Sequence, residues 1–96
     1  MEPTTELGLG LAALEKWGDA EKTLTTALAL QGKDPSPDPV VASRLNFALA
    51  RAHWGLGRDK RSALALASTA LDGVRTADGN WHDEARGIEQ WLKAHE

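Results

Sequence analysis

The chain has no cysteine and no tyrosine among its 96 residues, and phenylalanine occurs once. Without cysteine, disulfide bonds, thiolate metal sites and cysteine nucleophiles are excluded. The longest stretches without a charged side chain, 23–32 and 62–71, fall well short of the roughly 20 residues that span a bilayer. The first residues have no basic region and no apolar run, so no signal peptide is visible. We therefore expect a cytoplasmic protein with no membrane partner.

Basic charge is also scarce. The chain has 14 acidic residues against 11 basic ones and a formal net charge of -3. Nucleic-acid-binding domains normally carry a basic face, so we expect no nucleic-acid partner. A chain of this length forms at most one domain. We assign residues 1–96 to a single domain and expect it to be a fragment of a larger protein.

The remaining composition favours helices. Segments rich in leucine and alanine, with few β-branched or aromatic residues, lie on both sides of a loop that contains Pro35, Pro37 and Pro39. Three prolines this close cannot lie inside a helix or a central strand. Asp38 and Asn80 are N-cap residues before helical patterns, and glycines mark the stops. The sequence predicts an all-α fold with helices at 4–17, 19–31, 39–56, 60–76 and 80–94.

The third predicted helix is apolar on more than one face. One stripe follows helical spacing, while Phe47 and Trp54 lie seven residues apart on another face. A helix with two apolar faces packs on two sides, as in the middle of a stacked array. The main stripe is Val41, Leu45, Leu49, Ala52 and Leu56.

The chain also contains an internal repeat. The first copy reads Leu7-Gly8-x2-Leu11-x8-Ala20-x3-Leu24-x2-Ala27, the second Leu49-Ala50-x2-His53-x9-Ala63-x3-Ala67-x2-Ala70, and the third Trp81-x2-Glu84-Ala85-x2-Ile88. This pattern resembles the tetratricopeptide repeat (TPR) family. The longer first spacing, with its Pro-Asp loop, is similar to the kinesin-light-chain subtype. The stretch from Ala27 to Trp54 resembles the last repeats of bacterial signalling proteins such as serine/threonine kinases.

The resemblance implies an architecture and a function. The expected fold is a set of antiparallel helical hairpins stacked as a short α-solenoid, with repeats at 4–31 and 39–76 and a capping helix at 80–94. In this family, the first helices of successive repeats line a concave groove that receives peptides or helices of partner proteins. The groove positions transferred by register include Arg44, Arg51, Trp54, His82 and Arg86. Because the planar guanidinium of arginine can donate two hydrogen bonds to a carboxylate, an acidic partner is expected.

Catalytic and metal-binding patterns are weak. Ser43, Ser62 and Ser68 have no histidine and acid near them in a recognisable triad arrangement. His82, Asp83 and Glu84 are adjacent, and successive positions of a helix point about 100° apart, so they cannot converge on one ion. We therefore expect no enzyme, no metal and no cofactor.

A second class of function stays open. The four leucines of the first helix spread around it, and no polar face covers them: Leu7, Leu9, Leu11 and Leu14. The chain could therefore be a structural or oligomerisation segment whose N-terminal helix packs on another repeat or on a second copy. The last helix, in contrast, has a polar outer face that suits a cap.

Overall fold

In the computed structural model, residues 3–33, 39–57, 60–77, 79 and 81–95 are described. They form five helices and contain no strand, which confirms the all-α prediction. The proline loop at 34–38 and the cap residues Asp38 and Asn80 lie outside the described residues. The helices are α1 (Pro3–Ala13), α2 (Trp17–Gly32), α3 (Pro39–Gly55), α4 (Lys60–Thr76) and α5 (His82–His95).

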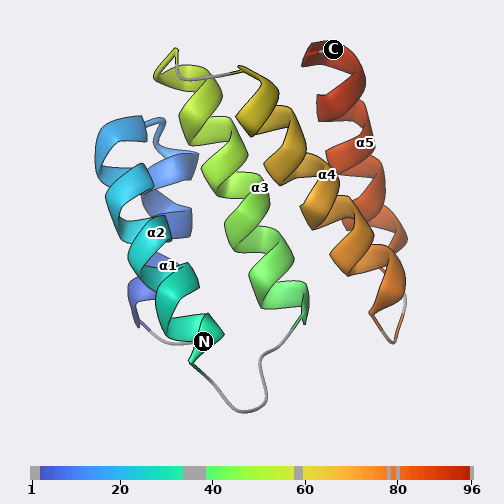
Figure 1. The fold of residues 1–96 in the computed structure, drawn as a ribbon, viewed down its shortest axis with the longest axis horizontal. Coiled ribbons are helices and arrows are strands. Elements are labelled where there is room, and N and C mark those ends of the chain that lie inside the picture. Colours follow the sequence, from blue (N-terminus) through green and yellow to red (C-terminus); the bar gives the residue numbers. More distant parts are fainter. Residues whose placement is uncertain (1–2, 34–38, 58–59, 78, 80, 96) are drawn as a thin grey trace.

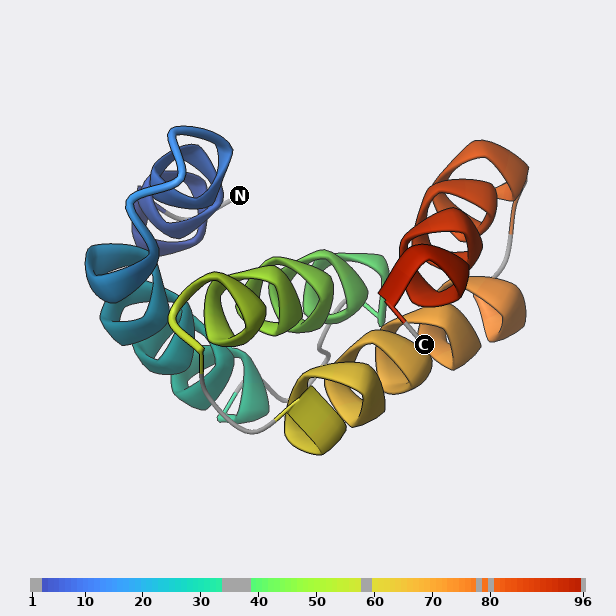
Figure 2. The same ribbon diagram turned by 90° about the horizontal axis from the view of Figure 1, so that it is seen from above.

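The helices alternate in direction and stack as antiparallel neighbours (Figure 1). Helix α3 contacts α1, α2 and α4, and α4 contacts α5. Viewed along the helices, the stack is curved (Figure 2): α1, α3 and α5 border its concave side, and α2 and α4 lie on the convex side. The predicted stacking of helical hairpins into a short helical array is therefore present.

The turn between α1 and α2 corrects the predicted boundary. The sequence placed the end of the first helix at Trp17, but α1 ends at Ala13 and Trp17 begins α2. The cause is Glu15, which adopts a left-handed backbone with a φ of 59°. The amide of Glu15 donates to Ala12 O at 3.0 Å and that of Lys16 donates to Leu11 O at 2.9 Å. This pair of bonds is a Schellman motif, in which glycine usually takes the left-handed position.

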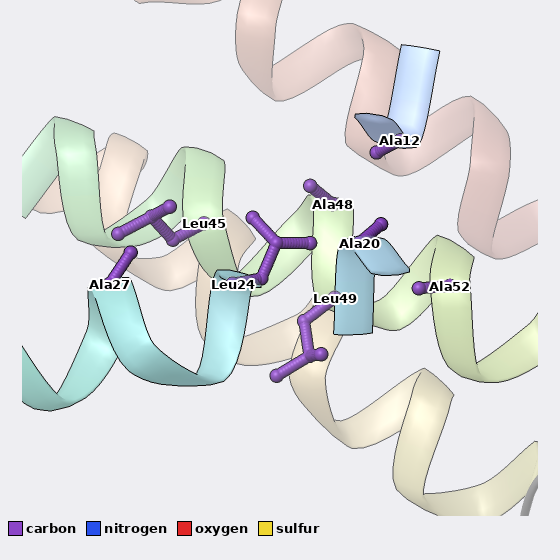
Figure 3. Close-up of a cluster of buried hydrophobic side chains, with 8 residues drawn as sticks. All are labelled: Ala12, Ala20, Leu24, Ala27, Leu45, Ala48, Leu49 and Ala52. Atoms are coloured by element: carbon purple, nitrogen blue, oxygen red, sulfur yellow. The ribbon is translucent and has the colours of Figure 1, made fainter. Parts of the chain in front are cut away.

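One core cluster joins α3 to the first hairpin. Leu24 of α2 and Leu45 of α3 are fully buried at its centre, and the other members are mostly alanines (Figure 3). Gly8 of α1 also lies at this contact, since a Cβ built there would be 2.8 Å from Leu24 Cδ2. Small residues on α1 and α2 thus bring the helix axes close together. The cluster consists of Ala12, Ala20, Leu24, Ala27, Leu45, Ala48, Leu49 and Ala52.

A second cluster joins α3 to α4 and α5. Ala50 of α3, Ala67 and Ala70 of α4 and Ile88 of α5 are buried in it, and Trp81 and Trp91 pack against its edge. Helix α3 therefore packs on two sides, as its two apolar faces predict. One position of the predicted stripe is wrong: Leu56 is 38% exposed, because α3 ends at Gly55 and Leu56 falls in the following turn.

Candidate functional site

A pocket is lined by residues of the α1–α2 turn and of α2, α3 and α5. Of these elements, α3 and α5 border the concave side of the stack (Figure 2). The volume of the pocket is about 380 Å³. Three of the chain's four tryptophans line it. We call it the concave pocket; its lining is Glu15, Trp17, Arg51, Trp54, Gly55, Trp91 and His95.

Contacts between aromatic rings hold α5 against α3 in this region. The ring of Trp91 meets Phe47 and Trp54 edge-on, each with centroids 5.8 Å apart. The His95 ring stacks on Trp91 at 4.2 Å with an interplanar angle of 22°, and it meets Trp54 edge-on at 4.6 Å. His95 Nδ1 also lies 2.7 Å from Trp91 O, one helical turn earlier. These contacts tie the last residues of α5 to the middle and end of α3, and so fix one wall of the pocket.

Two cations lie over the tryptophan faces. The guanidinium carbon of Arg51 is 5.6 Å from the Trp17 ring centroid, and Lys60 Nζ is 5.3 Å from the Trp54 centroid. Both distances fall within the range of cation–π attraction. Trp17 itself lies against Gly55, where a Cβ would come within 2.2 Å of the indole Nε1. The glycine at the end of α3 thus makes room for Trp17, and Trp17 in turn supports Arg51.

Arg44 lies elsewhere on α3. It pairs with Glu84 of α5, with Nε donating to Oε1 at 3.1 Å and Nη2 contacting the same oxygen. The two side chains are part-buried, so the ion pair links the two helices. A smaller apolar pocket of about 220 Å³ lies beside the pair, with Phe47, Val74 and Ile88 in its wall.

A third pocket, which we call the outer pocket, lies between the end of α4 and α5. Its volume is about 430 Å³, and Arg75 Nη2 donates to Glu89 Oε1 at 2.8 Å within it. Arg86 is exposed there and has no ion pair with any residue that the structure describes. The outer pocket is lined by Val74, Arg75, Gly79, Trp81, His82, Ala85, Arg86 and Glu89.

The five predicted groove residues do not line the same pocket. Arg51 and Trp54 line the concave pocket, Arg44 pairs with Glu84, and His82 and Arg86 line the outer pocket. Arg44, Arg51 and Arg86 therefore line three different pockets, and a groove that all three share stays a prediction. The register transfer selected His82 and Arg86 on the last helix, whereas Glu84, Trp91 and His95 contact α3. Position 84 is two residues from position 82, and two residues rotate a helical position by about 200°.

Sequence reasoning missed Trp17, Trp91 and His95 as members of this site. Trp91 and His95 are four residues apart, so they share a helix face and can stack. That spacing, together with Trp54 near the end of α3, was the feature of the sequence that could have predicted this aromatic cluster. The position of His95 near the end of the chain concealed its role.

Within the part of the chain that the structure describes, no three histidine, aspartate or glutamate side chains gather as a metal-ligand set. None of the helices described is long and apolar enough to cross a membrane. Comparisons with protein-family models, with curated proteins and with solved structures find no match for this chain.

Proposed function

We propose that the chain is a protein-interaction module that holds an acidic segment of a partner protein in its concave pocket. The observation that carries this proposal is the position of Arg51. Its guanidinium lies over Trp17 in a pocket that three tryptophans line. An arginine held on an aromatic ring keeps its planar N–H groups available for a carboxylate, while the neighbouring ring edges can receive apolar side chains.

The charges around the concave pocket agree with an acidic ligand. Arg51 lines it and Lys60 lies over its Trp54 ring, and the carboxylate among its lining residues is that of Glu15. A local positive field of this kind acts within a Debye length of about 8–10 Å, so the net charge of -3 does not cancel it.

The resemblance to TPR proteins supports the same function. The first helices of successive repeats border the groove in that family, and α1, α3 and α5 border the concave side here (Figure 2). We therefore propose a TPR-like module in a signalling protein of the cytoplasm. Its ligand is a peptide or helix of another protein, not a substrate to be turned over.

Charge reversal at Arg51 tests the proposal. A short peptide of alternating glutamate and leucine, titrated into the protein, should quench or shift tryptophan emission. Its affinity should fall as salt is added. The Arg51→Glu variant should lose this binding. Arg86→Glu makes the same change of charge in the outer pocket, so it serves as the matched control and should keep the binding.

Equal losses in the two variants would mean that net charge governs binding and would contradict a site at Arg51. The same peptide with lysine in place of glutamate gives a further control. If it binds as tightly as the acidic peptide, the proposed charge preference is wrong.

A second candidate function follows from α1. Leu7 of α1 is 58% exposed, and Leu14, which directly follows the end of α1, is 69% exposed. We propose that these two leucines dock on another repeat or chain. Light scattering tests the docking: a Leu7→Lys, Leu14→Lys variant should remove any association that the unmodified chain shows.

A further inference from the structure

His95 lines the concave pocket, and three contacts fix the orientation of its ring. The ring stacks on Trp91 with centroids 4.2 Å apart, it meets Trp54 edge-on at 4.6 Å, and its Nδ1 lies 2.7 Å from Trp91 O. A carbonyl oxygen only accepts hydrogen bonds, so Nδ1 is the donor and carries the proton of the neutral ring. The other nitrogen, Nε2, is therefore the atom that takes up a proton when the ring becomes charged.

Nε2 of His95 is open to a ligand. No residue that the structure describes has a hydrogen bond or an ion pair with it. The two nitrogens of an imidazole point away from each other, so the bond from Nδ1 to the carbonyl of Trp91 turns Nε2 away from that carbonyl. The side chain is half-buried and forms part of the pocket lining. A ligand in the pocket therefore meets an acceptor when the ring is neutral and an N–H donor when it is protonated.

The charged groups around this ring come from three other elements. Arg51 of α3 and Glu15 of the turn between α1 and α2 line the same pocket. Nζ of Lys60, the first residue of α4, lies 5.3 Å from the centroid of the Trp54 ring that His95 contacts. Arg51 has no ion pair with any residue that the structure describes. A ligand carboxylate that pairs with Arg51 therefore lies in the pocket that His95 lines, and its negative charge favours the protonated ring.

The other titratable groups nearby belong to different surfaces. Lys93 of α5 is exposed and two residues from His95, which places it about 200° around the helix. His53 of α3 contacts Glu21 of α2, with Nε2 3.3 Å from Oε2. His82, the third histidine of the chain, lines the outer pocket. Among the three histidines, His95 is thus the one that lines the concave pocket.

We propose that His95 is a second carboxylate-binding residue of the concave pocket and that its protonated form binds the acidic segment more tightly. The inference rests on the proposed function above and adds the regulation of that site by pH. The protonated Nε2–H donates to a carboxylate oxygen, whereas the lone pair of the neutral Nε2 repels it. Binding therefore takes up a proton, and affinity rises as the pH falls through the range in which histidine titrates. For one titrating group the rise is at most about tenfold per pH unit.

Isothermal titration calorimetry of the full chain with the glutamate–leucine peptide tests this linkage between about pH 7.5 and about pH 5.5. Histidine changes its charge in that range, while the glutamates of the peptide stay ionised. The unmodified chain should bind several-fold more tightly at the lower pH. Titrations in buffers that differ in ionisation enthalpy should show the uptake of up to about one proton per bound peptide.

Two variants of His95 separate its charge from its packing. His95→Phe keeps an aromatic ring next to Trp91 but has no nitrogen to protonate, so its affinity should be equal at the two pH values, without proton uptake. His95→Gln has no ring and does not titrate, and it should give the same flat profile. His82→Phe makes the matched change in the outer pocket and should keep the pH dependence of the unmodified chain. Circular dichroism should show the same helical content in all of these variants.

The outcomes distinguish this inference from the proposed function. Equal affinity of the unmodified chain at the two pH values would overturn the role of His95 but keep the binding of the acidic segment at Arg51. A pH dependence that persists in His95→Phe and His95→Gln would assign the proton to another group, and would also overturn it. An unmodified chain that does not bind the acidic peptide at either pH contradicts the proposed function itself, and the inference with it.

Discussion

On the side of α3 that faces the first hairpin, the contact is made by alanines, a glycine and two fully buried leucines. On the side that faces α5, it is made by the rings of Phe47, Trp54, Trp91 and His95 and by the Arg44–Glu84 pair. Small residues let helix axes approach closely and leave little surface open. Large, partly exposed rings hold the helices apart and keep their edges accessible. One helix therefore supplies both a closed core and the wall of an open pocket.

The largest expected effect on stability is on the side of α3 that faces the first hairpin. Leu24→Ala should lower the free energy of unfolding by about 3–5 kcal/mol, because it leaves a cavity in a fully buried cluster. Urea denaturation measures it. Leu30→Ala, on the exposed side of the same helix, should cost no more than about 0.5 kcal/mol. Similar midpoints for the two variants would mean that α2 is not packed as described.

On the open side, Trp91→Ala should cost about 2–3 kcal/mol, less than the range for a fully buried tryptophan, because the ring is half-buried. The loss should be local. Amide hydrogen exchange should rise mainly in α5, whereas Leu24→Ala should raise it across α1, α2 and α3. Trp91→Phe keeps an edge contact to Phe47 and Trp54, and should recover part of the stability. Uniform exchange in both alanine variants would remove the distinction between the two sides.

Alanine substitutions at two glycines should change stability in opposite directions. Gly55→Ala forces a methyl group into the Trp17 indole, and should destabilise the fold by about 1–2 kcal/mol. Gly87 lies in the interior of α5 with open space around its Cα, so Gly87→Ala should stabilise by about 0.5–1 kcal/mol. Thermal unfolding of both variants checks the signs. Stabilisation by Gly55→Ala would show that Trp17 does not lie on this residue.

A stability gain as small as that of Gly87→Ala is expected at the turn between α1 and α2. Glu15 takes a left-handed conformation that glycine adopts without strain, as Gly57 does after α3 with a φ of 71°. Glu15→Gly should therefore stabilise the protein by about 0.5–1 kcal/mol. A shift of the urea midpoint measures the gain. Lower stability in this variant would mean that the Glu15 side chain makes a contact worth more than the backbone strain.

The number and extent of the helices were largely predictable from the sequence, because leucine and alanine at helical spacing and the proline loop are local signals. The end of α1 was not predictable, because the left-handed residue that ends it is Glu15, whereas a glycine usually marks such a helix end in a sequence. The site was predictable only in part. Arg51 and Trp54 belong to the concave pocket, but the face of α5 depends on how the helix is rotated against α3. Contacts such as Arg44–Glu84 determine that rotation, and a repeat register alone does not.

The central claim is that the concave pocket, and not the outer pocket, receives the partner segment. The four tryptophans separate these surfaces: Trp17, Trp54 and Trp91 line the concave pocket, and Trp81 lines the outer one. Each indole N–H gives its own signal in a nitrogen–proton correlation spectrum of the labelled protein. On titration with the glutamate–leucine peptide, the account predicts that the signals of Trp17, Trp54 and Trp91 move together while that of Trp81 stays in place. Movement of Trp81 without the other three would contradict it.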